Sequence, residues 1–168
     1  MNNSILLYIS RFVALVLAQV ILFNHINFLG YINPYIYIIY IALAPLNTHK
    51  SLFLFVSFLL GLSIDMFGDS GGVHAAACVS TAFSRPIILR SVFGLSYEFQ
   101  TMKLSRVGLV PLFTYVAALV SIHHIILFSL EYFNIAHILQ IAKKTLFSGI
   151  LSSVVITIIL IFFRKKDS

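Results

Sequence analysis

Cysteine, tryptophan and charged residues are scarce in this chain. The single cysteine, Cys78, excludes a disulfide within the chain and a zinc site built on several cysteines. We interpret it as a small packing residue between helices. Tryptophan is absent, and charged residues are 10% of the 168 residues, against about 25% in a soluble domain. So little charge excludes an ordinary soluble protein of this size.

Hydrophobic residues make up most of what is present. They are 60% of the chain, and the mean hydropathy is +1.03. That much apolar surface needs a bilayer as its solvent, so we predict an all-α, polytopic membrane helix bundle. It forms a single integral membrane domain over residues 1–168. The net charge of +6 comes from small basic groups between apolar runs, which is typical of topology signals and not of a nucleic-acid interface.

About six apolar stretches are candidate membrane-spanning helices, each of which needs about 20 residues. They are Ile5 to Phe23, Pro34 to about Leu46, Ser51 to Phe67, Val73 to about Phe93, about Val107 to Leu130, and Thr145 to Phe163. The second is short and has tyrosines expected at a membrane interface, so a five-span chain in which it re-enters the membrane is the alternative. The first lacks the features of a cleavable signal peptide, and we expect it to be retained.

The positions of the basic residues bear on the number of spans. With six spans and a cytoplasmic N-terminus, the cytoplasmic segments hold Lys50, Arg90, Lys103, Arg106, Arg164, Lys165 and Lys166. The external loops hold only Lys143 and Lys144. This imbalance agrees with the positive-inside rule, so we favour six spans with both termini in the cytoplasm.

The stretch from Glu131 to Lys144 has a different pattern. Apolar residues recur in it at helical spacing with polar residues between them, namely Ile135, Ile138, Leu139 and Ala142. We predict a short amphipathic helix that lies on the outer membrane surface, and an apolar loop is the alternative.

Polar side chains within the apolar stretches are costly, so each is a candidate for function. They are Arg11, Gln19, Asp65, His74, Arg85, His123 and His124. Asp65, near the end of the third span, and His74, at the start of the fourth, are placed to meet at a helical hairpin. We interpret them as a clamp between the two helices, and a proton-linked or ligand site is the alternative.

Glycines surround this hairpin. Gly61 lies one turn before Asp65, where it lets a neighbouring backbone approach. Gly71 and Gly72 supply a tight reversal, and the Lys and Ser/Thr of a phosphate-binding loop do not follow them. Arg85 precedes a proline in the fourth span. We expect a kinked helix whose cation faces inward or extends towards the cytoplasm, and a contact with a partner helix or a lipid phosphate is the alternative.

Residues for catalysis are not evident. His123 and His124 are adjacent and point to different faces of a helix, whereas a two-histidine metal clamp uses a spacing of three or four. The sequence offers no Ser-His-Asp set, no paired carboxylates and no His-Glu-x-x-His motif. We therefore expect no enzymatic activity, no metal and no cofactor.

The stretch Gly61-Leu62-Ser63-Ile64-Asp65, followed by Gly71-Gly72-Val73-His74-Ala75, resembles the signature of the rod shape-determining MreD family. In that family a helix ends in Gly-x-x-x-Asp, a glycine-bearing turn follows, and a Gly-x-His-Ala segment starts the next helix. The chain length, the number of apolar stretches and the basic C-terminal end are similar too. The polar Asp69 and Ser70 in the turn depart from the pattern.

The resemblance implies a non-catalytic scaffold in the bacterial inner membrane that supports cell shape and peptidoglycan synthesis in the cell-elongation (rod) complex. It implies MreC as the direct partner and, through MreC, contact with MreB, RodA and the elongation transpeptidase. It also implies a fold similar to the substrate-binding subunits of energy-coupling-factor vitamin transporters. We expect a cytoplasmic contact at Phe93, Tyr97, Phe99 and Met102.

Two further functions stay open. A substrate-binding subunit of a small-molecule, vitamin-type transporter suits a six-helix bundle, although the sequence has no evident cluster of polar residues for a cavity. A lipid-modifying membrane enzyme needs an acid, a base or a metal set that the sequence does not nominate. Membrane lipids are expected neighbours in every case, and nucleic acid in none.

Overall fold

The computed structural model describes residues 2–26, 28, 32–46, 48–94, 104 and 107–163. Its regular elements are the helices α1 (Asn2–Ile21), η1 (Phe23–His25), α2 (Ile38–Ala42), α3 (Lys50–Gly68), α4 (Val73–Phe93), α6 (Leu109–Tyr132), η3 (Ile135–His137) and α7 (Ile138–Phe162). Apart from one isolated β-bridge between Phe28 and Ile32, the described residues form no strand pairing. The prediction of an all-α bundle is confirmed.

Four of these helices are long and apolar enough to cross a membrane: Ile5–His25, Lys50–Gly68, Leu109–Tyr132 and Ile138–Phe162. The chain is therefore a helical membrane bundle. Helix α4 has the bounds expected for the fourth span but is more polar than these four. Polar residues are tolerated in α4 because it packs between α3 and α6, so that one of its faces is buried in protein. Its buried residues are Ala75, Ala77, Cys78, Thr81, Ala82, Arg85, Ile88 and Leu89.

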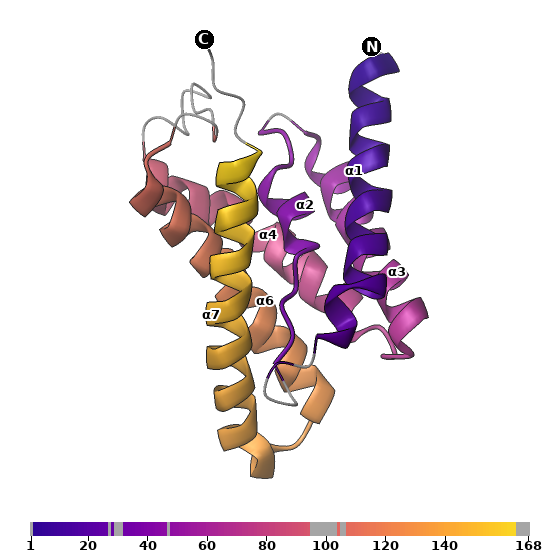
Figure 1. Cartoon of the computed structure of the whole chain (residues 1–168), viewed down its shortest axis with the longest axis vertical. Coiled ribbons are helices and arrows are strands. Elements are labelled where there is room, and N and C mark those ends of the chain that lie inside the picture. Colours follow the sequence, from indigo (N-terminus) through magenta and orange to yellow (C-terminus); the bar gives the residue numbers. More distant parts are fainter. Residues whose placement is uncertain are drawn as a thin grey trace.

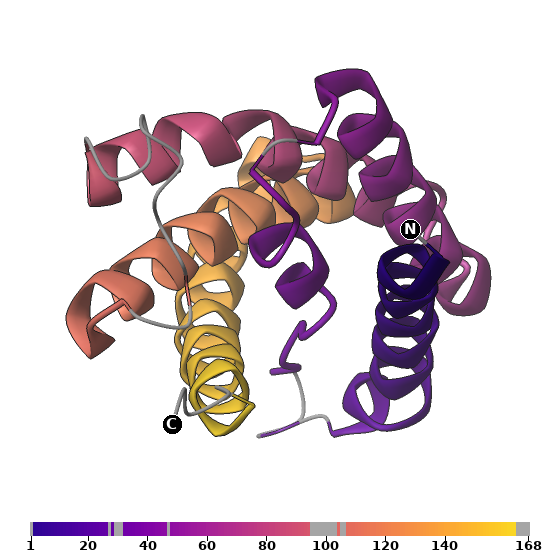
Figure 2. The ribbon, with the colours of Figure 1, turned by 90° about the horizontal axis from the view of Figure 1, so that it is seen from above.

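The long helices form an arc in the order α1, α3, α4, α6 and α7, in which each packs on the next (Figure 2). The arc is open between α1 and α7, and the segment 32–46, which includes α2, lies inside it (Figure 2). Helix α1 begins, and α7 ends, at the same end of the bundle (Figure 1).

Helices α6 and α7 pack through complementary faces. The buried residues of α6 recur every three or four positions, as expected for one face of a helix: Leu112, Tyr115, Val116, Leu119, Val120, His123, His124, Leu127 and Phe128. The buried face of α7 is rich in small residues, with Ser148, Ser152 and Ser153. Small side chains let neighbouring helices approach closely, which favours association inside a membrane.

The prediction of a helix from Pro34 to about Leu46 is wrong in its extent. Only Ile38–Ala42 forms an α-helix, and the residues on either side are turns or irregular chain. The segment is nevertheless deeply buried, with Ile36, Tyr37 and Ile41 at most 3% exposed. Irregular backbone is tolerated at membrane depth only where protein covers it and binds its polar groups. Here the surrounding helices supply those partners, as described below.

The prediction of a separate amphipathic helix from Glu131 to Lys144 is also wrong. Helix α6 continues to Tyr132, and α7 begins at Ile138 rather than at Thr145. Polar residues that were expected on the outer membrane surface instead connect the two helices. Lys144 Nζ lies 2.9 Å from Glu131 Oε1 and 5.0 Å from the centre of the Tyr132 ring. This stretch is therefore the turn between α6 and α7 and the first turns of α7.

Candidate functional site

The hairpin between α3 and α4 brings together the residues that carry the sequence motif. Gly71 and Gly72 have φ values of 65° and 92°, a region that glycine enters without the strain of a side chain. Gly61 faces the start of α4 so closely that a Cβ atom there would overlap the backbone of His74 and Ala75. The two helices are therefore in backbone contact about two turns before α3 ends.

The Asp65 carboxylate closes this hairpin. It accepts hydrogen bonds from the main-chain N–H groups of Ala75 at 2.9 Å and His74 at 3.0 Å, and from the Ser70 hydroxyl. The first N–H groups of a helix have no partner within the helix, and they favour a negative charge. Asp65 is 5% exposed and thus caps α4 from a neighbouring helix. The expected meeting of Asp65 with His74 takes place at the His74 main chain.

The His74 imidazole takes part in a different contact. Its Nδ1 lies 2.7 Å from the Tyr37 hydroxyl, which lies 2.9 Å from His123 Nε2. The hydroxyl can donate to one ring and accept from the other, so it joins α4, the irregular segment and α6. A hydroxyl between two imidazoles can also relay a proton, and the proton-linked interpretation stays a prediction. Sequence reasoning missed Tyr37 because it assigned the tyrosines of this segment to a membrane interface.

The neighbouring His124 turns to another helix. Its Nε2 lies 3.2 Å from Ser152 Oγ of α7, and the same Oγ accepts a hydrogen bond from the Tyr35 main-chain N–H at 3.0 Å. His123 and His124 are both fully buried and have different partners. Over the described ranges, no group of three or more His, Cys, Asp or Glu side chains could hold a metal ion.

Arg85 binds the other end of the irregular segment. Its Nε donates to the Tyr115 hydroxyl at 3.0 Å, and its Nη2 donates to the carbonyl oxygens of Ala42, at 3.3 Å, and Ala44. Tyr115 donates in turn to the Ala42 carbonyl at 3.0 Å. Arg85 is 4% exposed, so of the two expected orientations it takes the inward one. Its described hydrogen-bond partners are all uncharged oxygens.

Gln19 of α1 binds the start of the same segment. Its Oε1 accepts from the Ile36 main-chain N–H at 2.8 Å, and its Nε2 donates to the Pro34 carbonyl at 3.1 Å. The irregular backbone is thus held near its start by Gln19 and Ser152, and near its end by Arg85 and Tyr115. These contacts provide what the absent helical hydrogen bonds would have provided.

The expected cytoplasmic contact is described only in part. Phe93 ends α4, is half-buried, and packs its ring 5.6 Å from that of Tyr115. Tyr97, Phe99 and Met102 lie outside the described residues. The sequence analysis also missed Tyr115, which sits four residues before Leu119 on the buried face of α6. Its place on that face is the signal that could have identified it.

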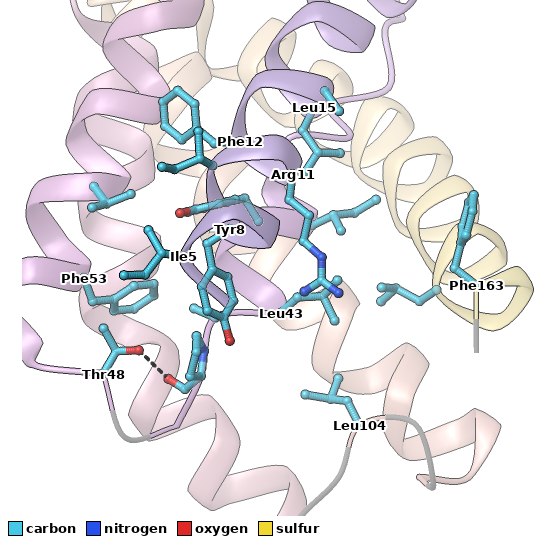
Figure 3. Close-up of a pocket in the computed structure, with 18 of the residues that line it drawn as sticks. Ile5, Tyr8, Arg11, Phe12, Leu15, Leu43, Thr48, Phe53, Leu104 and Phe163 are labelled. Atoms are coloured by element: carbon cyan, nitrogen blue, oxygen red, sulfur yellow. Dashed lines mark hydrogen bonds between the residues drawn. The ribbon is translucent and has the colours of Figure 1, made fainter. Parts of the chain in front are cut away.

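A cavity of about 1070 Å³ lies at the end of the bundle where α1 begins and α7 ends (Figure 3). It is bounded by α1 from Ile5 to Leu15, by residues between Ile39 and Pro45 together with Thr48, by the first half of α3, and by the end of α7 with Phe163. Its walls are mainly apolar, and Arg11 extends into the space beside Leu43 (Figure 3). Compared with known proteins, the chain matches no protein-family model, no curated protein and no solved structure.

Proposed function

We propose that this chain is a non-catalytic scaffold of the bacterial cell-elongation complex, of the MreD type, which acts by binding an MreC-like partner in the membrane. The observation that carries the proposal is the α3–α4 hairpin. Gly61, Asp65, Gly71 and Gly72, which the sequence offers as a motif, occupy positions that each have a defined physical task. Gly61 allows close helix approach, Asp65 caps a helix, and Gly71 and Gly72 reverse the chain. These three tasks explain why the motif has these residue types at this spacing.

The proposed topology has six crossings, with the irregular segment 32–46 as the second. An even number of crossings agrees with the start of α1 and the end of α7 lying at one end of the bundle (Figure 1). Lys50, at the start of α3, and Arg90, in the last turn of α4, support a cytoplasmic assignment for that end. The likeness to the substrate-binding subunits of energy-coupling-factor transporters and the bacterial inner-membrane location are parts of the same proposal.

The proposed mode of action is helix packing. Large apolar side chains of α1 and α7 are exposed, and they suit contact with lipid or with the single membrane helix of a partner: Leu6, Val13, Ile150, Val154 and Ile158. Contact with MreB, RodA and the elongation transpeptidase then follows through MreC, and the protein supports cell shape and peptidoglycan synthesis without performing a reaction.

Co-purification tests this proposal. The full chain is tagged and extracted in mild detergent from a host that also expresses an MreC-type protein, and an unrelated single-span protein serves as the control partner. We expect the MreC-type protein alone to be retained, and depletion of the chain in its own host to produce rounded cells. Absence of the complex together with normal cell shape contradicts the proposal.

A substrate-binding subunit of a vitamin-type transporter is the second candidate, and the 1070 Å³ cavity favours it. Ligand pockets in proteins usually measure about 300–1,000 Å³ and are mainly apolar with a few polar groups. Extraction of the purified protein and mass spectrometry of the extract distinguish the two functions. A small vitamin-like molecule recovered in equimolar amount supports the transporter subunit.

A further inference from the structure

Arg85 of α4 and Arg11 of α1 differ in burial and in partners. Arg85 is buried and Arg11 is exposed, and of the two only Arg85 has hydrogen-bond partners among the described residues. Arg85 binds three oxygen atoms of its own chain. Arg11 makes no hydrogen bond or ion pair with any residue of the described ranges. It is nevertheless the charged residue in the wall of the 1070 Å³ cavity. A cation in an apolar membrane site is costly unless an anion or other oxygen atoms bind it.

Arg11 lies inside the candidate membrane span Ile5–His25. It is nine residues from the start of α1 at Asn2, which corresponds to about 14 Å at the rise of an α-helix. Figure 3 shows its side chain extending from α1 to a place beside Leu43, with Phe163 further away across the cavity. The described acidic residues are far along the sequence from this wall, since Asp65 and Asp69 belong to the hairpin and Glu131 to the end of α6.

The remaining walls require an apolar occupant. Phe12, Leu15, Val56 and Ile159 line the cavity, and each comes from a helix that is long and apolar enough to span a membrane. A free inorganic anion would neutralise Arg11 and leave these walls without a partner. A ligand that satisfies both the guanidinium and the walls has an acidic group joined to a long hydrocarbon chain.

We propose that this cavity binds one anionic membrane lipid, with its phosphate on the Arg11 guanidinium and a hydrocarbon chain along the apolar walls. The planar guanidinium presents paired N–H donors that match two phosphate oxygens. Anionic lipids are abundant in the cytoplasmic leaflet, which is the leaflet at this end of the bundle in the proposed topology.

Native mass spectrometry of the full chain in mild detergent tests the proposal. The protein is mixed with equal amounts of phosphatidylglycerol and phosphatidylcholine that carry the same acyl chains. We expect one bound phosphatidylglycerol per chain, preferred over phosphatidylcholine by about tenfold or more. Both lipids carry a phosphate, but the choline cation of phosphatidylcholine cancels its charge and is repelled by Arg11. Arg11→Gln should reduce the preference to about one, and Arg11→Lys should keep part of it because the charge remains.

Two further variants separate the lipid site from general effects of charge and folding. Lys143→Gln removes a cation from the exposed start of α7, at the other end of that helix, and should leave the preference unchanged. Ala14→Phe fills part of the cavity and should lower the retention of both lipids. Circular dichroism and size-exclusion chromatography verify that each variant folds. If Arg11→Gln does not fold, Arg11→Lys still tests the site.

Several results would overturn the proposal. One is equal retention of the two lipids by the unaltered chain, and another is undiminished phosphatidylglycerol binding by folded Arg11→Gln. Displacement of the lipid by inorganic phosphate would assign the site to a free anion instead. A dimer that forms with loss of the lipid and of its headgroup preference would assign the cavity to a second copy of the chain.

Discussion

Replacement of Asp65 by leucine should destabilise the bundle strongly. The carboxylate is the acceptor for two N–H groups at the start of α4, those of His74 and Ala75. Leucine has no acceptor, and each buried N–H left without a partner costs about 1–3 kcal/mol, so the total loss is about 2–6 kcal/mol. Asp65→Asn keeps one oxygen acceptor and should lose about half of that amount.

Unfolding in mixed micelles of dodecyl maltoside with an increasing fraction of dodecyl sulfate, followed by circular dichroism, measures this loss. The matched control is Asp69→Asn, which removes a carboxylate four residues further on. Asp69 is exposed and has a φ of 49°, a conformation that asparagine adopts readily, so its stability should change by less than about 0.5 kcal/mol. If Asp65→Leu unfolds at the same detergent fraction as Asp69→Asn, the capping argument is wrong.

Three further perturbations test the helix contacts. Gly61→Ala should destabilise by about 1–3 kcal/mol in the same unfolding assay, because the added methyl group overlaps the backbone of α4. Gly149→Ala, whose Cβ would lie 4.0 Å from Val120 Cγ1, should be neutral or stabilising by up to about 1 kcal/mol. Tyr37→Phe removes the hydroxyl between two histidines and should cost about 1–3 kcal/mol, and Tyr8→Phe, at the cavity wall, should cost little. Arg85→Met removes the donor to the Ala44 carbonyl, while Tyr115 still donates to Ala42. Limited proteolysis should then cleave residues 39–46 faster than in the unaltered chain.

The sequence predicted the regular helices and the hairpin well. Helix α4 has the bounds expected from its apolar stretch, and α3 differs from its expected bounds by one residue at each end. Such helices satisfy their own backbone groups, so local composition decides where they begin and end. The roles of Gly61, Gly71 and Gly72 could also be predicted, because glycine is the residue that permits close helix approach and positive φ.

The irregular segment could not be predicted in this way. Its apolar residues resemble a short span, but Pro34, Tyr35 and Ile36 bind Gln19 and Ser152, which are remote in the sequence. The role of the His74 ring was hidden likewise, because its partner Tyr37 belongs to this segment. The start of α7 was missed because its charged residues suggested a water-exposed surface. In the structure one of them, Lys144, instead binds Glu131 of α6.

The irregular segment also has a consequence for how the protein is made. The acceptor of the Tyr35 N–H, Ser152, lies 117 residues further along the chain, and Tyr115, which donates to the Ala42 carbonyl, lies 73 residues after Ala42. Until the ribosome has delivered those residues, these two peptide groups would be unpaired in lipid, at a cost of several kcal/mol each. We therefore expect the segment to enter the bilayer after translation of α7, and expect a nascent chain arrested before Ser152 to keep it in contact with water.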